Sequence, residues 1–220
     1  MGEMLSLKGE DGFEFAAYRA APAQGRKGGV IVIQEIFGID EHVRRDVDRW
    51  AEMGFEAIAP ALYDRREPGF VAGHDPDGMQ AGIAHARGTP IDQALGDVAA
   101  VRDALSPKGK VFIVGYCYGG SIAWLAAARV PGLSGASSYY GSMVQANAAL
   151  PLQCPTIVHL ARLDGIPADE VKAAVEASHP DTPVWIYEDA QHGFNNEDPA
   201  RHSPAAADLA RSRTLALFSS

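Results

Sequence analysis

The fold of this chain is decided by the stretch Val111-Phe112-Ile113-Val114-Gly115-Tyr116-Cys117-Tyr118-Gly119-Gly120. Its apolar first half is typical of a strand buried on both faces. A tight turn follows, with small residues on either side of Cys117, and the helix-like run Ser121–Ala128 comes next. Strand, strained turn and helix around one central nucleophile define a nucleophile elbow. The central residue here is cysteine, whereas most proteins built in this way carry serine.

Apolar runs of strand length alternate with helical patterns on both sides of the elbow. We expect strands over 3–7, 13–18, 29–35, 55–60, 111–114, 135–140, 156–160 and 184–188. Helices are expected over 41–53, 91–105, 168–177 and 205–218, with Asp40 as the N-cap of the first and Gly54 as its stop. This order predicts a single α/β domain over residues 1–220, with a mostly parallel central sheet and helices on both faces.

The segment from Asp64 to Pro90 interrupts this alternation. It is rich in Gly, Asp and Arg, and its weak periodicity predicts loops with one short helix near 79–86. Long irregular insertions in a compact domain are often functional. Within it, His74-Asp75-Pro76-Asp77 has a simpler interpretation as a solvated loop than as a weak metal contact. His159 is expected to be packed within its strand, and no histidine spacing is typical of zinc.

Composition narrows the possible partners and the compartment. A net charge of −9 without a run of Lys or Arg argues against nucleic acid. The N-terminus lacks a basic region followed by an apolar core, and no stretch approaches the ~20 apolar residues of a membrane span, so neither a secretory signal nor a membrane is expected. Two cysteines, Cys117 and Cys154, fit a cytoplasmic protein with reduced thiols. A monomer is the simplest expectation.

Cysteine at the elbow needs a base, because a free thiol with a pKa of about 8.5 is only slightly ionised at neutral pH. In hydrolases of this architecture an acid and then a histidine follow the nucleophile, each in a loop after a later strand. Asp164 follows the expected strand 156–160, and His192 follows 184–188. Alone, Asp164 would be a loop or cap residue and His192 a surface histidine. Together with Cys117 they predict a triad in which the aspartate orients the imidazole toward sulfur.

A tetrahedral intermediate at this thiol needs an oxyanion hole. The backbone N–H of Tyr118, directly after the nucleophile, is expected as one donor, and that of Ile36, after the strand 29–35, as the other. Loss of one such donor typically costs about 10²–10³ in rate. No metal or organic cofactor is implied.

These residues resemble the dienelactone hydrolase family of α/β-hydrolases over nearly the whole chain. The resemblance is carried by Gln34-Glu35-Ile36-Phe37-Gly38, Pro60-Ala61-Leu62-Tyr63, Gly115-Tyr116-Cys117-Tyr118-Gly119-Gly120, Tyr139-Tyr140-Gly141 and the Asp164 and His192 loops. Each motif is weak alone, but their order and spacing together are specific. The resemblance implies an α/β-hydrolase fold and hydrolysis of the lactone 4-carboxymethylenebut-2-en-4-olide to maleylacetate, in the catabolism of chlorinated aromatic compounds.

The resemblance also implies a role for Glu35. In the family, the matching glutamate lies beside the cysteine and takes part in its substrate-induced activation. A carboxylate near a thiol accepts its hydrogen bond and opposes formation of a second anion. The Cys117 thiol would then stay neutral until Glu35 moves or takes up a proton.

The chain departs from the family at the residues that bind the substrate carboxylate. The family uses two arginines, but Asn196 stands at one position and Met79 at the other, with Arg87 nearby. Losing both forked donors removes the strongest recognition of a planar carboxylate. Three arginines are possible substitutes, although each has a simpler interpretation as a surface residue: Arg65, Arg66 and Arg162.

Aromatic side chains near the expected mouth of the site are candidates for lining a pocket: Phe37, Tyr63, Tyr118, Tyr140 and Phe194. Core packing is an equal alternative for Phe37 and Phe194. The sequence therefore predicts hydrolysis of a small lactone such as dienelactone through an acyl-cysteine. A general carboxylesterase or thioesterase is the alternative. A non-catalytic thiol sensor is a weaker one, because a sensor has no use for an oriented base.

Overall fold

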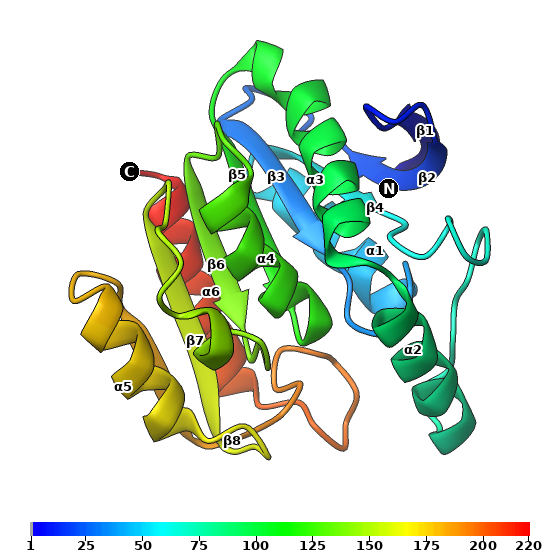
Figure 1. The fold of residues 1–220 in the computed structure, drawn as a ribbon. Coiled ribbons are helices and arrows are strands. Elements are labelled where there is room, and N and C mark those ends of the chain that lie inside the picture. The colour runs from blue at the N-terminus through cyan, green and yellow to red at the C-terminus, as the bar shows by residue number, and fades with distance from the viewer. Residues whose placement is uncertain (1) are drawn as a thin grey trace. The chain divides into compact units, whose positions relative to one another are not determined.

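A computed structural model describes residues 2–220 of the chain (Figure 1). The chain forms two compact units, Met1–Ile113 and Val114–Ser220. Within residues 2–220, no helix combines the length and the apolar character needed to cross a membrane. The prediction of one domain over residues 1–220 stays a prediction.

The first unit contains four complete strands and three α-helices among the described residues. Its strands are β1 (Glu3–Lys8), β2 (Glu14–Ala20), β3 (Gly28–Ile33) and β4 (Phe55–Pro60), and its helices are α1 (Glu41–Glu52), α2 (Pro76–Gly88) and α3 (Ile91–Leu105), followed by the short η1 (Ser106–Lys108). β1 pairs antiparallel with β2, and β2 with β4, whereas β3 and β4 are parallel. Figure 1 shows α3 in front of these strands and α1 behind them.

The second unit continues the alternation of strand and helix. It follows β5 (Val111–Tyr116), the strand that contains the boundary, and consists of α4 (Tyr118–Arg129), β6 (Gly135–Tyr139), η2 (Gln145–Asn147), β7 (Thr156–Leu163), α5 (Ala168–Ser178), β8 (Val184–Gln191) and α6 (Pro204–Phe218). β6, β7 and β8 are mutually parallel. In Figure 1, α4 lies in front of β6 and α6 behind it, so both faces are covered.

The strands follow the order β1-β2-β4-β3-β5-β6-β7-β8 in a mostly parallel sheet, which confirms the predicted α/β fold class. Every residue of β3, β4 and β5 is buried, as their continuous apolar runs predict. The predicted bounds of β4 and α3 are confirmed, and Asp40 caps α1 by accepting the Val43 N–H at 2.9 Å.

Apart from β4 and α3, the predicted elements have bounds that differ from the observed ones by one to three residues, and two of these differences fall in segments predicted to contribute to the site. The strand 29–35 ends at Ile33, so Gln34 and Glu35 belong to the loop that follows it. There the Gln34 side chain accepts the Leu62 N–H and donates to the Glu35 carbonyl, so it bonds outside the strand ladder. The short helix near 79–86 is instead α2, Pro76–Gly88, which begins early because Asp75 caps it and Pro76 suits its first turn.

A buried chain of hydrogen bonds joins β7, β8 and α6 in the second unit. His159 is packed, as predicted, and its ring lies between the Tyr187 hydroxyl at 2.9 Å and Thr214 Oγ1 at 3.1 Å. Because Thr214 donates its one proton to the Ala210 carbonyl, His159 donates from Nε2 and accepts the Tyr187 O–H at Nδ1. Arg213 in turn donates to the Tyr187 oxygen. Burial, assisted by the charge of Arg213, lowers the pKa of His159 to about 3.

Acid should therefore destabilise the protein through His159. An unfolded histidine has a pKa of about 6.5, so between that pH and about 3 the unfolded chain binds one more proton here than the folded chain. The free energy of unfolding should fall by roughly 1 kcal/mol per pH unit through this site as the pH falls through that window. Urea unfolding of wild type and His159→Gln, at neutral pH and near the acid end of the window, measures the difference in slope.

The control is Ser212→Ala on α6, which removes an exposed hydroxyl that donates to the Leu209 carbonyl and no titrating group. This variant should keep the wild-type pH dependence between the same limits. Equal pH dependence in wild type and His159→Gln would contradict the assignment.

Candidate active site

The backbone at Cys117 adopts the strained geometry expected of a nucleophile elbow. Cys117 has φ 55° and ψ −114°, in the left-handed region that residues with a side chain rarely adopt. It stands between the end of β5 and the start of α4. Its N–H donates to the Tyr139 carbonyl at 3.0 Å, and its carbonyl accepts from Ser121 at 3.2 Å. The thiol is therefore carried by a backbone that is bonded on both sides.

Two glycines make this turn possible. A Cβ on Gly115 would overlap the carbonyl oxygen of Gly119, and a Cβ on Gly120 would overlap that of Tyr139. The obstacles are backbone atoms, which no rotamer change removes. Gly115 and Gly120 are thus required by the close approach of β5, α4 and the end of β6.

The three predicted triad residues come together in the second unit. Asp164 and His192 each follow directly after a strand, β7 and β8, whose last paired residues are Leu163 and Gln191. This register places the two side chains beside one another, and His192 Nδ1 lies 2.7 Å from Asp164 Oδ2. The Cys117 thiol is a further hydrogen-bonding partner of the His192 ring.

The electrostatics of this cluster favour a protonated imidazole. Burial acts to lower the pKa of His192, but the hydrogen bonds and charges of Asp164 and Cys117 outweigh it and raise that pKa to about 10. A histidine placed between a carboxylate and a thiol is stabilised as imidazolium, in particular when sulfur is the thiolate. Asp164 is nearly buried, while the His192 side chain is one-third exposed, so the cluster remains open to solvent.

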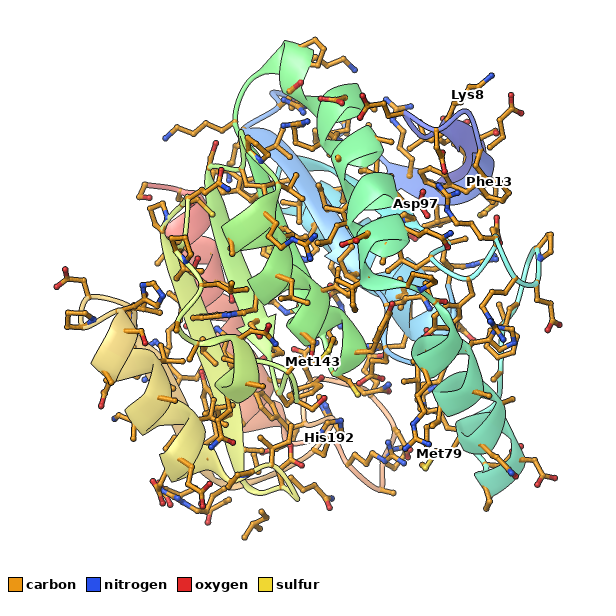
Figure 2. All side chains as sticks on the ribbon, viewed as in Figure 1. Lys8, Phe13, Met79, Asp97, Met143 and His192 are labelled. Carbon is orange, nitrogen blue, oxygen red and sulfur yellow. The ribbon has the colours of Figure 1, made fainter. Side chains whose placement is uncertain are left out.

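Tyr140 packs against the catalytic histidine candidate from a strained backbone of its own. Its φ is 38°, and its N–H donates to the His159 carbonyl at 2.7 Å. The Tyr140 ring lies 4.9 Å from the His192 ring and 5.3 Å from that of Phe194. The sequence predicts Tyr140 only as an aromatic residue that lines the pocket. Its packing against the His192 ring could not be predicted, because no local pattern encodes contacts between distant side chains. Figure 2 shows His192 and Met143 at the lower end of this unit, where β6 ends.

Three further predicted residues of the second unit, Tyr118, Phe194 and Asn196, are buried. Tyr118 begins α4, and Phe194 packs against Tyr139, Tyr140 and Tyr187, which fits the core alternative. The Asn196 side chain accepts the Asp198 N–H at 3.1 Å and so stabilises its own turn. Their roles in substrate binding stay predictions.

The predicted residues of the first unit lie in and near the loop after β3. Glu35 and Phe37 are buried there, and Ile36 between them is half-buried. Tyr63 is buried in the turn after β4, with its ring 5.7 Å from Phe70 and 5.4 Å from His85. Their proposed contacts with substrate or thiol stay predictions.

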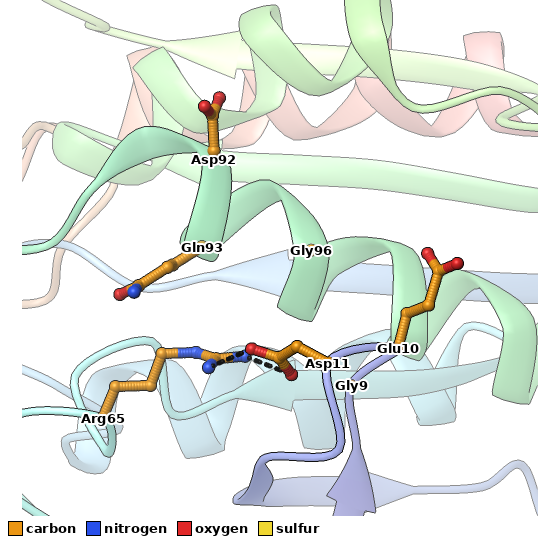
Figure 3. Close-up of a pocket in the computed structure, with 7 residues that line it drawn as sticks. All are labelled: Gly9, Glu10, Asp11, Arg65, Asp92, Gln93 and Gly96. Atoms are coloured by element: carbon orange, nitrogen blue, oxygen red, sulfur yellow. Dashed lines mark hydrogen bonds and ion pairs between the residues drawn. The ribbon is translucent and has the colours of Figure 1, made fainter.

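Arg65 is not the surface residue that its sequence suggests. Its side chain is 11% exposed, and its guanidinium pairs with Asp97 at 2.7 Å and Asp11 at 2.6 Å. These carboxylates, Asp97 first, raise the pKa of Arg65. Arg65 and Asp11 line a cavity of about 420 Å³. Figure 3 shows them with the other lining residues, which are Gly9, Glu10, Asp92, Gln93 and Gly96. Among the predicted site residues, only Arg65 lines this cavity.

Arg162 is likewise occupied by carboxylates. It pairs with Glu188 at 2.9 Å and with Asp169 at 2.6 Å, and these partners, Glu188 first, raise its pKa. The two cysteines also differ. Cys154 precedes β7 by two residues, is free like Cys117, and has a pKa raised to about 11 by burial, so it stays a neutral thiol. Across residues 2–220, no group of three or more His, Cys, Asp or Glu side chains is placed to hold a metal ion.

The chain is an α/β-hydrolase by fold, with a cysteine at its nucleophile elbow. A crystal structure from Klebsiella pneumoniae, of a protein provisionally named dienelactone hydrolase, superposes with a TM-score of 0.86 at 29% identity, covering 99% of this chain and 98% of that one. The family model for the dienelactone hydrolase family matches residues 15–220. The chain therefore belongs to the dienelactone hydrolase family.

Curated relatives match over comparable lengths. The carboxymethylenebutenolidase of Pseudomonas putida is 32% identical over 97% of this chain and 94% of its own length. A Synechocystis protein with the same name, given provisionally, is 31% identical over 93% of this chain and 91% of its own. Members of the family are hydrolases of ester and lactone bonds, and this chain is such a hydrolase.

The pKa of His192 should depend on Asp164. In wild type the imidazole should titrate near pH 10, whereas in Asp164→Asn the lost charge and hydrogen bond should lower the midpoint by at least about one pH unit. An NMR titration of the His192 ring measures both values.

The control for this titration is Asp169→Asn, which neutralises the exposed carboxylate that pairs with Arg162. It should leave the His192 midpoint in place. A His192 midpoint near 6.5 in wild type would show that Asp164 and Cys117 do not offset its burial.

Proposed function

We propose that this hydrolase opens a small lactone or ester through an acyl-Cys117 intermediate, with His192 as base and acid and Asp164 orienting it. The observation that carries the proposal is the strained Cys117 whose thiol is hydrogen-bonded to His192, which is itself bonded to Asp164. The strained turn, the His192 base and the Asp164 carboxylate all serve one nucleophile, and a structural thiol would require none of them.

The reaction begins from the pair in which His192 holds the thiol proton as imidazolium, and the Cys117 thiolate attacks the carbonyl carbon. The resulting oxyanion accepts hydrogen bonds from the backbone N–H groups of Tyr118 and Ile36. Support for Tyr118 comes from its place as the first residue of α4, where the helix dipole favours negative charge. When the intermediate collapses, the C–O bond breaks and imidazolium protonates the leaving oxygen.

Release of the acyl group repeats these steps with water. His192 removes a proton from water, the hydroxide adds to the thioester carbonyl, and the C–S bond breaks. The thiolate is regenerated beside imidazolium, and the product leaves as a carboxylic acid that gives its proton to solvent. A high pKa of His192 suits both halves, because the protonated ring is the acid for the leaving group and the counter-ion of sulfur.

Dienelactone is the first candidate substrate, because the family and the Pseudomonas putida relative carry that activity in their names. A second candidate is a carboxylesterase or thioesterase without a carboxylate clamp. This second candidate is favoured because the side chains that could replace the two missing arginines are already bonded to other groups of the protein. Asn196 bonds its own turn, and Arg65 and Arg162 are each paired with two carboxylates.

Replacing the nucleophile tests the mechanism. Cys117→Ala should lose about 10³-fold or more of the turnover of lactones and esters, as expected when a nucleophile is removed. The matched control is Cys154→Ala, which removes the half-buried neutral thiol and should keep wild-type turnover. Mass spectrometry of quenched wild type should detect an acyl group on Cys117.

Equal activity of Cys117→Ala and wild type on every substrate would eliminate the covalent mechanism. A panel of cis- and trans-dienelactone, aryl esters and acyl thioesters decides between the two substrate classes. A protein that is modified once at Cys117 and then stops would be a sensor.

Glu35 is proposed to restrain the thiol. It is a buried carboxylate just beyond the end of β3, and burial makes formation of another anion near it costly. Glu35→Gln should raise the rate at which iodoacetamide alkylates Cys117 and should alter lactone turnover. Glu52→Gln, at the exposed end of α1, serves as the control. If Glu35→Gln left both alkylation and turnover unchanged, the restraint would be refuted.

A further inference from the structure

The loop after β3 is covered by the segment 70–74 of the long insertion. Ala72 donates its N–H to the Phe37 carbonyl at 3.0 Å, and Gly38 forms an antiparallel bridge with Val71. Gly38 has φ 80°, and a Cβ there would overlap the Phe70 carbonyl oxygen. The two backbones are therefore in direct contact, which only glycine at this position permits.

His74 ties this loop to the start of α1. Its ring stacks on Phe37, with centroids 4.0 Å apart and planes 16° from parallel. Its Nε2 lies 2.8 Å from Asp40 Oδ2, while the other oxygen of Asp40 caps α1 through Val43. One imidazole thus joins the side chain that follows Ile36 to the carboxylate that begins the next helix.

α2 lies against the other side of the same loop. Gly82 is the one buried residue of α2, and a Cβ on it would overlap the Ile36 carbonyl oxygen. The carbonyl and Cβ of Ile36 are therefore bounded by α2, while Phe37 after it is bounded by His74 and the segment 70–74. The loop has few remaining ways to move without breaking one of these contacts.

We propose that His74 is a positioning residue that braces the loop 34–40 and so keeps the Ile36 amide directed at the oxyanion. The inference rests on the proposed function, in which that amide is an oxyanion donor. His74 does not take part in the chemistry: it acts through Phe37 and Asp40, which fix the backbone on both sides of Gly38. Preorganised donors stabilise a transition state because they require no reorientation during the reaction. In a loosened loop, the Ile36 N–H would be directed at the oxyanion for only part of the time.

Two variants separate the contacts of His74. His74→Ala removes both the stacking and the bond to Asp40, whereas His74→Phe keeps a ring on Phe37 and loses only the bond. Acetylation of Cys117 by p-nitrophenyl acetate, measured from p-nitrophenolate release, should slow by about tenfold in His74→Ala, less than the 10²–10³ for loss of a donor. The acetylation rate of His74→Phe should lie between those of His74→Ala and wild type. Asp77→Ala, on the exposed first turn of α2, should match wild type.

Alkylation of Cys117 by iodoacetamide is the discriminating measurement. This displacement reaction forms no oxyanion, so its rate should not fall in either His74 variant, and it should rise if the loosened loop also carries Glu35 away from the thiol. Hydrogen–deuterium exchange should be faster in His74→Ala over a peptide containing 34–39 and unchanged over one containing 115–120.

Three results would overturn the proposal: unchanged exchange over 34–39, acetylation within about twofold of wild type, or an equal fall in alkylation and acetylation. Failure of the proposed function has a different signature, which is full ester turnover by Cys117→Ala. The exchange measurement does not depend on turnover. The role of His74 can therefore be refuted while the covalent mechanism is supported, and the covalent mechanism can be refuted while the role of His74 is supported.

Discussion

The hydrogen bond from the Cys117 N–H to the Tyr139 carbonyl is the interaction on which the second unit's site depends. Cys117 occupies a backbone conformation that costs about 1–3 kcal/mol for a residue with a side chain, and such strain persists only where the surroundings over-determine it. Here Gly115 and Gly120 allow backbone atoms of α4 and β6 to approach the turn closely. Close packing on both sides thus stabilises the turn, and the Cys117 side chain extends from this turn where α4 begins.

The partners of this thiol depend on strand register. Because β7 and β8 are parallel and their last pair is Leu163 with Gln191, the next residues of the two strands are neighbours. Asp164 and His192 occupy those positions, and a shift of one residue in either strand would separate them. Below them, the buried chain through His159 joins β7, β8 and α6 by side-chain hydrogen bonds, and the His159 carbonyl also accepts from Tyr140. Apolar packing of Val and Leu alone is not directional, so it would specify the register of these strands less strictly than these hydrogen bonds do.

The sequence predicts most of the fold because its signals are local. The apolar runs of β3, β4 and β5, the Asp40 cap and the order Cys117, Asp164, His192 are all visible within short windows. The misplaced features are those that depend on distant partners. Arg65 looks like a surface residue until Asp97 and Asp11 are brought beside it, and His74 looks like a solvated loop residue until Phe37 and Asp40 meet it. Asn196, aligned with a missing arginine, turns out to bond its own turn.

By itself, the sequence determined the fold class, the family and the identity of the three triad candidates, because strand and helix periodicity and motif order are properties of neighbouring residues. Only the tertiary structure decided the protonation preference of His192, the support given by Tyr140 and the bracing of the loop 34–40. These depend on burial and on contacts between residues far apart in the chain, such as Asp164 with His192 and His74 with Phe37. Charge, desolvation and ring packing act through space, and no local pattern encodes the distances over which they act.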